Sequence, residues 1–302
     1  MRCVAVTGAA GRIGAPLVRQ LVAAGVQVRA LSRRRRESPP GVEWITGDLL
    51  EPRTLAALVD GADVVVHAGG QLDGAPEEVE RSLVEGTRAV LDAARAIRMV
   101  HVSSLVVLQT ARRAENIDEE SALEPMPERR GIYTRAKSAA EALVRSRGAT
   151  QDVVVVRPGI VVDDTVTVPT SVALAVGPID LFVGPRNGTM PLVHSEDVAS
   201  GLIVVAGRSP RGDVVHLVDP LPVTRDALHA RLKARSRRGT PVPVGGMIVG
   251  LARMMSAMPF PTVGNAAYRL ASAGSDHRWP VRRADDLGWR PSHLANWLGT
   301  SR

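Results

Sequence analysis

Short apolar runs alternate with longer amphipathic stretches through the first half of the chain. Brief apolar runs are typical of buried strands, whereas apolar residues that recur every three or four positions are typical of helices. The runs predict a strand from Val4, a strand and turn over 42–49, and further strands over 26–32, 63–68 and 100–108. The periodic stretches predict helices over 15–22, 52–59, 76–95 and 133–147. This alternation predicts an α/β protein with a Rossmann-type, doubly wound parallel sheet.

The second half of the chain is less regular, and residues 161–185 are unusually apolar. An apolar stripe also recurs there at roughly helical spacing: Met247, Ile248, Leu251, Met254, Met255 and Met258. The stripe indicates either ordinary core packing or the lining of a pocket for a bulky apolar ligand, because methionine serves both purposes. Residues 228–238 predict a helix that ends in a solvated basic run.

The first predicted strand leads into a loop with three glycines, Gly8, Gly11 and Gly14, just before a helix. Glycines at this spacing let the chain turn sharply, let main-chain N–H groups approach a pyrophosphate, and let the helix pack on its strand. The positive end of the helix then faces the phosphates. The loop, which also contains Arg12 and Ile13, predicts a dinucleotide site, although a tight turn without a ligand needs the same glycines.

Four arginines follow the second predicted strand, where many dinucleotide-binding proteins carry an acidic residue. An acid there binds a free ribose 2′-hydroxyl, whereas arginine accommodates a 2′-phosphate. Arg33 and Arg34 therefore predict a preference for NADP(H) over NAD(H). The alternative is a solvated basic loop, which is our interpretation of Arg35 and Arg36.

Tyr133 and Lys137 are four residues apart at the start of a predicted helix and so share one of its faces. A phenol has a pKa near 10, and a neighbouring cation lowers that pKa by stabilising the phenolate. Ser104, at the end of the fifth predicted strand, is placed to hold a substrate oxygen, although Ser103 could point into the site instead. The three residues predict acid–base catalysis. His67 also ends a strand, and we interpret it as a packed residue.

Composition narrows the class of protein. The 302 residues are 45% hydrophobic and 23% charged, which indicates a folded globular protein. A net charge of +7 suggests an anionic ligand, but the few aromatic residues argue against nucleic acid. The longest apolar stretch, 241–251, is too short to span a bilayer. Because Cys3 is the single cysteine, no disulfide can form within the chain, and these features predict a cytoplasmic protein. We expect no bound metal and neither nucleic acid nor a membrane as a partner.

Further motifs accompany the glycine loop and the Tyr133/Lys137 pair along nearly the whole chain. They are Gly47-Asp48-Leu49, His67-Ala68-Gly69, Gly86-Thr87, Val102-Ser103-Ser104, Glu141, Arg157-Pro158-Gly159, His194-Ser195-Glu196-Asp197-Val198-Ala199 and Leu287-Gly288-Trp289-Arg290-Pro291. Together they resemble an extended or atypical short-chain dehydrogenase/reductase. The similarity is to the epimerase/dehydratase and dihydroflavonol reductase-like groups.

The resemblance implies roles for further residues around the cofactor. It assigns Asp48 and Leu49 to the adenine, Ala68, Gly69 and Gly70 to the ribose and phosphates, and Pro158, Gly159 and Ile160 to the nicotinamide. Lys137 would also hold the nicotinamide ribose, and Ser103 is expected among the cofactor contacts. One departure concerns the proton relay, because Leu83 stands where such proteins usually have asparagine.

The resemblance also implies how the chain is divided. Residues 1–160 would form an NADP-binding Rossmann domain, to which 190–218 returns with a strand at 214–218. The smaller C-terminal substrate-binding lobe would lie within 161–302, mostly in 161–189 and 219–302. Either a monomer or a homodimer paired through 76–95 and 132–147 fits this division.

These features predict an NADP(H)-dependent ketoreductase or alcohol dehydrogenase that acts by hydride transfer, with Tyr133 as general acid or base. The expected substrate is an apolar metabolite, polycyclic or polyketide-like. One alternative is a nucleotide-sugar epimerase or dehydratase that retains NAD, although residues 105–109 lack the tyrosine and glycine common in those enzymes. The other is a non-catalytic NADP(H)-sensing regulatory protein, which the Ser104, Tyr133 and Lys137 set disfavours.

Overall fold

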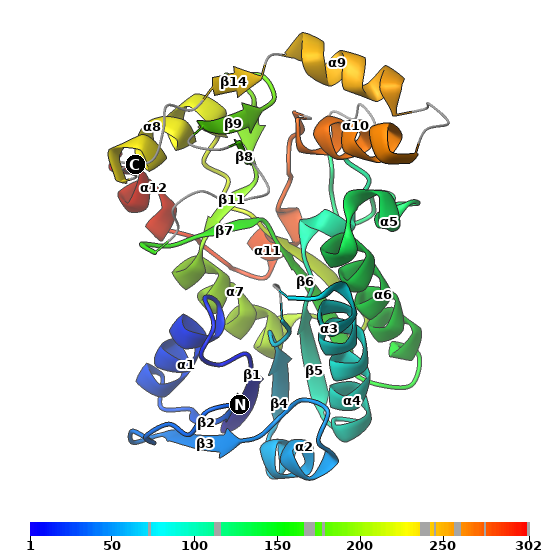
Figure 1. Cartoon of the computed structure of the whole chain (residues 1–302). Helices are drawn as coiled ribbons and strands as arrows, with labels where there is room; N and C mark the ends of the chain where they lie inside the picture. The colour runs from blue at the N-terminus through cyan, green and yellow to red at the C-terminus, as the bar shows by residue number, and fades with distance from the viewer. Residues whose placement is uncertain are drawn as a thin grey trace.

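A seven-stranded, fully parallel sheet forms the centre of the molecule (Figure 1). The computed structural model describes residues 1–71, 74–111, 116–165, 173–176, 179–235, 242–244, 246–256, 261–274 and 276–300. The strands, in order across the sheet, are β12 (Val214–Leu217), β6 (Val153–Pro158), β5 (Arg98–Val102), β4 (Val64–His67), β1 (Cys3–Thr7), β2 (Gln27–Ser32) and β3 (Val42–Thr46). Strand order reverses between β1 and β4. The predicted doubly wound Rossmann-type sheet is therefore confirmed.

Helices cover both faces of this sheet, as expected when parallel strands are connected by crossovers. One face is covered by α1 (Gly14–Ala23), α7 (Ser195–Arg208) and the short α11 (Arg282–Asp286). The other face is covered by α2 (Pro52–Val59), α4 (Gly86–Ala93) and α6 (Ile132–Arg147). The central strands consequently bury both of their sides: in β1, Val4 and Val6 face α1, and Ala5 faces the opposite layer.

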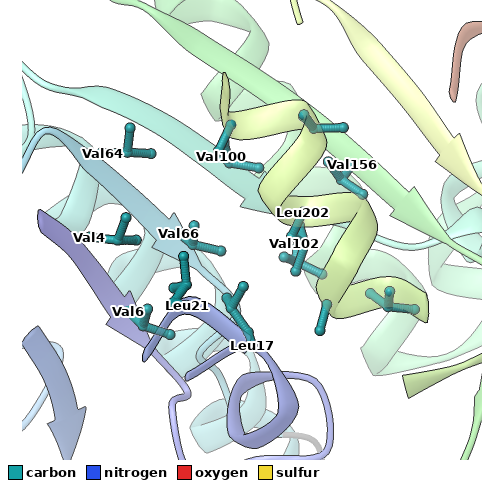
Figure 2. Close-up of a cluster of buried hydrophobic side chains, with 14 of the residues drawn as sticks. Val4, Val6, Leu17, Leu21, Val64, Val66, Val100, Val102, Val156 and Leu202 are labelled. Carbon is teal, nitrogen blue, oxygen red and sulfur yellow. The ribbon is translucent and has the colours of Figure 1, made fainter. Parts of the chain in front are cut away.

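The core beneath α1 and α7 consists of branched aliphatic side chains from neighbouring strands. Figure 2 labels Val4, Val6, Val64, Val66, Val100, Val102 and Val156 from the strands, with Leu17 and Leu21 from α1 and Leu202 from α7. β-branched residues suit such a pleated, doubly buried surface. This core holds α1 and α7 against the sheet.

Two predicted elements end or bend earlier than the sequence indicates. The fifth strand stops at Val102 instead of Leu108, and Leu105–Val107 forms a 3-10 turn, η2. Leu105 and Val107 pack in a separate small core with Leu108, so the run stays apolar although the strand has ended. The helix predicted over 76–95 comprises α3 (Pro76–Glu80), a π-helical turn η1 (Arg81–Glu85) and α4.

Most of the smaller elements lie beyond the carboxyl ends of the strands (Figure 1). The paired strands are β7 (Ile160–Val162) with β11 (Leu192–His194), β10 (Thr189–Met190) with β13 (Val223–Thr224), and the sheet of β8 (Ala173–Val176), β9 (Ile179–Val183) and β14 (Val242–Val244). The helices are α5 (Pro127–Arg130), α8 (Arg225–Arg235), α9 (Gly246–Met255), α10 (Pro261–Ala273) and α12 (His293–Leu298). We refer to the elements that follow β6, apart from β11, α7, β12 and α11, as the lobe.

The apolar stripe on α9 differs from both expectations. Ala252 packs against Ala267 and Ala271 of α10, and Val249 is also buried, so the opposite side of α9 faces outward. Four members of the stripe are exposed: Met247, Ile248, Leu251 and Met254. Met255 is partly buried, and Met258 lies outside the described residues. Within the described ranges, no helix combines the length and the apolar character that crossing a membrane requires.

Candidate active site

Ser104, Tyr133 and Lys137 meet where β5 ends and α6 begins. The backbone leaves β5 at Val102, and Ser104 caps the following 3-10 turn by accepting a hydrogen bond from the Val106 amide at 3.3 Å. The Ser104 hydroxyl is also hydrogen-bonded to the Tyr133 phenol. Tyr133 lies in the first turn of α6, and Lys137 follows one turn later. The structure thus brings the predicted serine and tyrosine into direct contact.

Tyr133 keeps its proton more firmly than the sequence predicts. Burial raises the pKa of the phenol, and the hydrogen bond from Ser104 opposes this only in part. The apolar neighbours responsible include Leu83 and Ala136, which form a small buried cluster against Tyr133. We expected Lys137 to lower this pKa, but desolvation outweighs any such effect in the protein alone. At neutral pH Tyr133 is therefore a protonated phenol, ready to act as an acid.

Lys137 is a buried ammonium that is 7% exposed. Its Nζ donates a hydrogen bond to the Val102 carbonyl oxygen at 2.8 Å, which ties α6 to the end of β5. Burial lowers the pKa of Lys137 to about 8, and the nearby Glu141 carboxylate opposes that shift. Lys137 is consequently still mostly protonated at neutral pH, but it is much closer to titration than an exposed lysine.

A buried ion pair that the sequence did not assign to any role lies beneath this site. Arg157, with an exposed fraction of 0%, contacts the Glu141 carboxylate at 2.5 Å. The Ser103 hydroxyl donates a hydrogen bond to the same carboxylate at 2.6 Å. Ser103 therefore faces Glu141, and its expected contact with the cofactor stays a prediction. The sequence offers one signal for the position of Glu141. It follows Lys137 by one turn of helix, so the two side chains share a helix face.

At Gly8 and Gly14 the glycine loop packs so closely against neighbouring backbone that a side chain cannot fit. Gly8 has a φ of +67°, and a Cβ there would lie 2.5 Å from the Ala68 carbonyl oxygen. A Cβ at Gly14 would overlap the Gly8 carbonyl oxygen. The Thr7 hydroxyl accepts a hydrogen bond from the Gly69 amide at 3.0 Å, which joins the ends of β1 and β4. No side chain caps the start of α1. The Ala15 amide donates to the Gly11 carbonyl oxygen and Pro16 has no N–H, so within the described chain the Gly14 amide is the first-turn donor left for an anion.

The other residues assigned to the cofactor lie along the same edge. Each follows the carboxyl end of a parallel strand: Arg33 and Arg34 after β2, Asp48 and Leu49 after β3, Gly70 after β4, and Gly159 and Ile160 after Pro158 of β6. In open α/β sheets, ligands bind outside the carboxyl ends of the strands where the strand order reverses. The uncapped helix and the close-packed glycines fit a dinucleotide. Individual contacts remain predictions.

The four arginines after β2 do not behave alike. Arg33 and Arg34 are exposed, and their side chains form no hydrogen bond or ion pair with the described part of the chain. Arg36, which we interpreted as solvated, instead places its guanidinium 5.2 Å from the centre of the Trp44 ring and donates to the Ser32 hydroxyl. A cation–π contact explains this difference, because the aromatic face attracts the guanidinium.

Arg12 has a partner in the lobe. Its guanidinium lies 3.1 Å from the Asp163 carboxylate, just beyond β7, whereas the neighbouring Ile13 packs against the core beneath α1. An ion pair at a half-exposed site contributes little stability. It nevertheless links the glycine loop to the first segment of the lobe. The predicted cofactor contact of Arg12 would have to compete with Asp163.

His67 is a packed residue, as we interpreted it. Its ring nitrogens are hydrogen-bonded to the hydroxyls of Thr7 at 2.7 Å and Thr87 at 3.0 Å. Burial lowers the pKa of His67 to about 3, and the positive charge of Lys137 contributes. The imidazole is therefore neutral at physiological pH and bridges β1 to α4.

A cavity of about 380 Å³ lies between the loop after Ser104 and the lobe helices. Its lining includes Gln109, Ala111, Pro125, Met126, Arg253, Ser256, Tyr268 and Ala271. The Tyr268 hydroxyl donates to the buried Glu124 carboxylate at 2.7 Å, and burial together with Glu124 raises the pKa of Tyr268 to about 12. The chain's second tyrosine thus anchors the lobe.

The fold and the site together define a class of protein. A Rossmann sheet with a glycine loop at its switch point and a Ser/Tyr/Lys set at the same edge is the arrangement of short-chain dehydrogenase/reductase-type proteins. Comparison with known sequences agrees. The chain belongs to the NAD dependent epimerase/dehydratase family, which it matches over residues 4–217.

Two similar relatives are reductases by name. The chain is 35% identical over 232 residues to a 4-hydroxy-2-methyl-3-oxo-4-farnesyl-3,4-dihydroquinoline-1-oxide ketoreductase of Stigmatella aurantiaca, covering 72% of this chain and 68% of the relative. It is 34% identical over 232 residues to a ceramide reductase of Caulobacter vibrioides, covering 74% of this chain and 65% of the relative. These alignments thus span about two thirds of each relative's own length.

A solved structure matches the fold over almost the whole chain. It is a short-chain dehydrogenase/reductase superfamily protein of Agrobacterium tumefaciens with bound NAD. The superposition gives a TM-score of 0.73 at 20% identity and covers 98% of this chain and 94% of the other. At that identity the likeness establishes the shared fold.

Proposed function

We propose that this protein is an NADP(H)-dependent reductase that converts a ketone on a bulky apolar metabolite into an alcohol, or catalyses the reverse reaction. The observation that carries the proposal is the contact between Ser104 and the partly buried, protonated phenol of Tyr133, with Lys137 one turn behind it. A carbonyl reduction requires an acid at the oxygen, and this arrangement supplies one at neutral pH.

The three side chains have separate roles in this proposal. Tyr133 donates its phenolic proton to the substrate oxygen, and the Ser104 hydroxyl holds the same oxygen. The Lys137 ammonium stabilises the phenolate that proton transfer leaves behind. When bound, the nicotinamide cofactor supplies or accepts the hydride. Because burial raises the Tyr133 pKa, the protein alone is poised for the reductive direction.

The cofactor assignment rests on charge. The carboxyl end of β2 is Ser32, and Arg33 and Arg34 follow it. No carboxylate stands at these positions to accept a hydrogen bond from a ribose 2′-hydroxyl. Both arginines are exposed and available for a 2′-phosphate. The glycine loop and the uncapped start of α1 would hold the pyrophosphate. NADP(H) carries both the 2′-phosphate and the pyrophosphate that these residues would bind.

The substrate assignment rests on the lobe and on the relatives. The cavity beside α9 and α10 has mixed lining and is of the size that takes a small molecule. The names of the two similar relatives denote reductases for a farnesyl-bearing ketone and for ceramide, both with long apolar parts. These names support an apolar substrate in preference to a nucleotide sugar.

Comparing ligand classes tests this proposal. With NADP⁺ present, ketones and alcohols that carry fused rings or long acyl chains should raise the thermal midpoint more than UDP-glucose does, by mass action. The same apolar ketones should be reduced with consumption of NADPH. A co-purifying, tightly retained NAD with stabilisation by UDP-glucose alone would instead identify an epimerase or dehydratase. Tight NADPH binding without turnover of any carbonyl would identify the regulatory alternative.

A further inference from the structure

Exposed apolar side chains gather at the lobe end of the molecule. Apart from Met1, the large exposed ones in the described part of the chain are Leu123, Met247, Ile248, Leu251, Met254 and Val263. Most belong to α9, where Met247 is 88% exposed, Met254 76% and Leu251 55%. Soluble surfaces carry single exposed apolar residues routinely, but a contiguous group on one helix marks an interaction site.

The exposed residues occupy one face of α9. Met247, Leu251 and Met254 recur at intervals of four and three residues, so they project from the same side of the helix. On the opposite side, Ala252 packs against α10 and Val249 is buried. Figure 1 shows α9 on the outside of α10, at the far end of the molecule from β3. The outward face, which we call the α9 face, therefore points toward the surroundings.

The amino-acid sequence on either side of α9 is strongly basic. Residues 227–275 contain seven lysines and arginines and no aspartate or glutamate. This one stretch accounts for a charge equal to the net charge of the whole chain, +7. A second copy of the protein would bring an equally positive stretch against the first. An anionic membrane surface complements both the exposed apolar residues of the α9 face and the basic sequence that flanks α9.

We propose that the α9 face docks on the surface of a lipid bilayer that contains anionic lipids. The sequence predicts no membrane partner because no segment can span a bilayer, but an interfacial helix needs only to embed its apolar side among the headgroups. Basic residues near the surface add electrostatic attraction to anionic lipids. Arg253 and Ser256, at the end of α9, line the lobe cavity, so docking brings that cavity to the bilayer. The docking proposal stands independently of the proposed reaction.

Vesicle sedimentation tests the proposal. The full-length protein is mixed with vesicles of phosphatidylcholine alone or of phosphatidylcholine with phosphatidylglycerol. We expect binding to the anionic vesicles, weakened by high salt because screening reduces the electrostatic part. The double variant Met247→Gln/Leu251→Gln should bind about tenfold more weakly or worse, since two exposed apolar side chains lose their burial. The matched variant Met247→Leu/Leu251→Met, which keeps the face apolar, should bind as wild type does.

Three results would overturn the proposal. The first is that the wild type binds neither kind of vesicle. The second is that the Gln double variant binds the anionic vesicles as well as the wild type does. The third is that the wild type is a dimer that binds no vesicles, whereas the Gln double variant is a monomer. The last result would identify the α9 face as a contact between copies. NADPH-dependent turnover of a water-soluble ketone should be the same in all three proteins. That readout separates failure of docking from failure of the proposed function.

Discussion

At the scale of single residues, the site depends on groups that burial holds away from their usual pKa. Tyr133 stays protonated and Lys137 is brought to about 8, each mainly through desolvation. The sequence predicted both residues because a four-residue spacing fixes a shared helix face. It could not predict the direction of the Tyr133 shift, which depends on Leu83 and Ala136 packing beside the phenol.

The Lys137→Met variant should reveal how Lys137 weakens the fold. The folded pKa of about 8 lies below the ordinary value of 10.5, so protonation favours the unfolded chain. The resulting penalty is complete below the folded pKa and disappears as pH rises through the unfolded value. The free energy of unfolding of the wild type should therefore increase by about 2 kcal/mol relative to that of the variant as the pH rises from about 7 to about 10.

Urea unfolding of both proteins across this pH range measures the effect. Arg53→Met serves as the control, because it removes an exposed cation from α2 and should leave the pH profile of wild type unchanged. Parallel stability curves for wild type and Lys137→Met would contradict the buried, shifted ammonium described above.

At the scale of elements, the sequence predicted strands and helices well wherever the apolar residues kept a single spacing, that of a strand or that of a helix. The apolar run over 100–108 predicted a strand that is too long, because Leu105 and Val107 are buried in a 3-10 turn and look the same in the pattern. The π-helical turn at Arg81–Glu85 left no signal either. The Glu141–Arg157 pair required knowing that α6 packs against β6, which no local pattern reveals.

The loop after β2 carries the prediction about cofactor choice. A hydrogen bond to a charged group contributes about 1.5–3 kcal/mol. Two such contacts from Arg33 and Arg34, discounted for exposure and salt, correspond to a preference for NADPH over NADH of about 10²-fold. Replacing both by serine should remove most of this preference by weakening NADPH, with little change for NADH.

Cofactor titrations at fixed ionic strength provide the measurement. Arg35→Ser is the matched control, since it removes an exposed arginine from the same loop that we assign to solvent. Its preference should stay within a few-fold of wild type. If wild type binds NADH as tightly as NADPH, the two arginines are only a solvated loop and the assignment is wrong.

At the scale of the whole molecule, the chain joins a predictable sheet to a lobe that sequence patterns describe poorly. The order of strands follows from crossover rules that apply to any βαβ sequence. The lobe consists of short strands and helices whose partners are distant in the chain, such as β14 beside β9. The spacing of its methionine stripe along the sequence is the same for a helix face that points inward and for one that points outward. Only the contact with α10 determined that the stripe faces outward.

The central claim is that Tyr133 gives its proton to the substrate oxygen during carbonyl reduction. Single-turnover oxidation of NADPH by an apolar ketone, measured for wild type and Tyr133→Phe together with NADPH affinity, tests it most directly. Loss of a positioned acid lowers rates by about 10²–10⁴-fold, and we expect that loss with NADPH affinity nearly unchanged. A Tyr133→Phe protein that still oxidises NADPH at close to the wild-type rate would contradict the account.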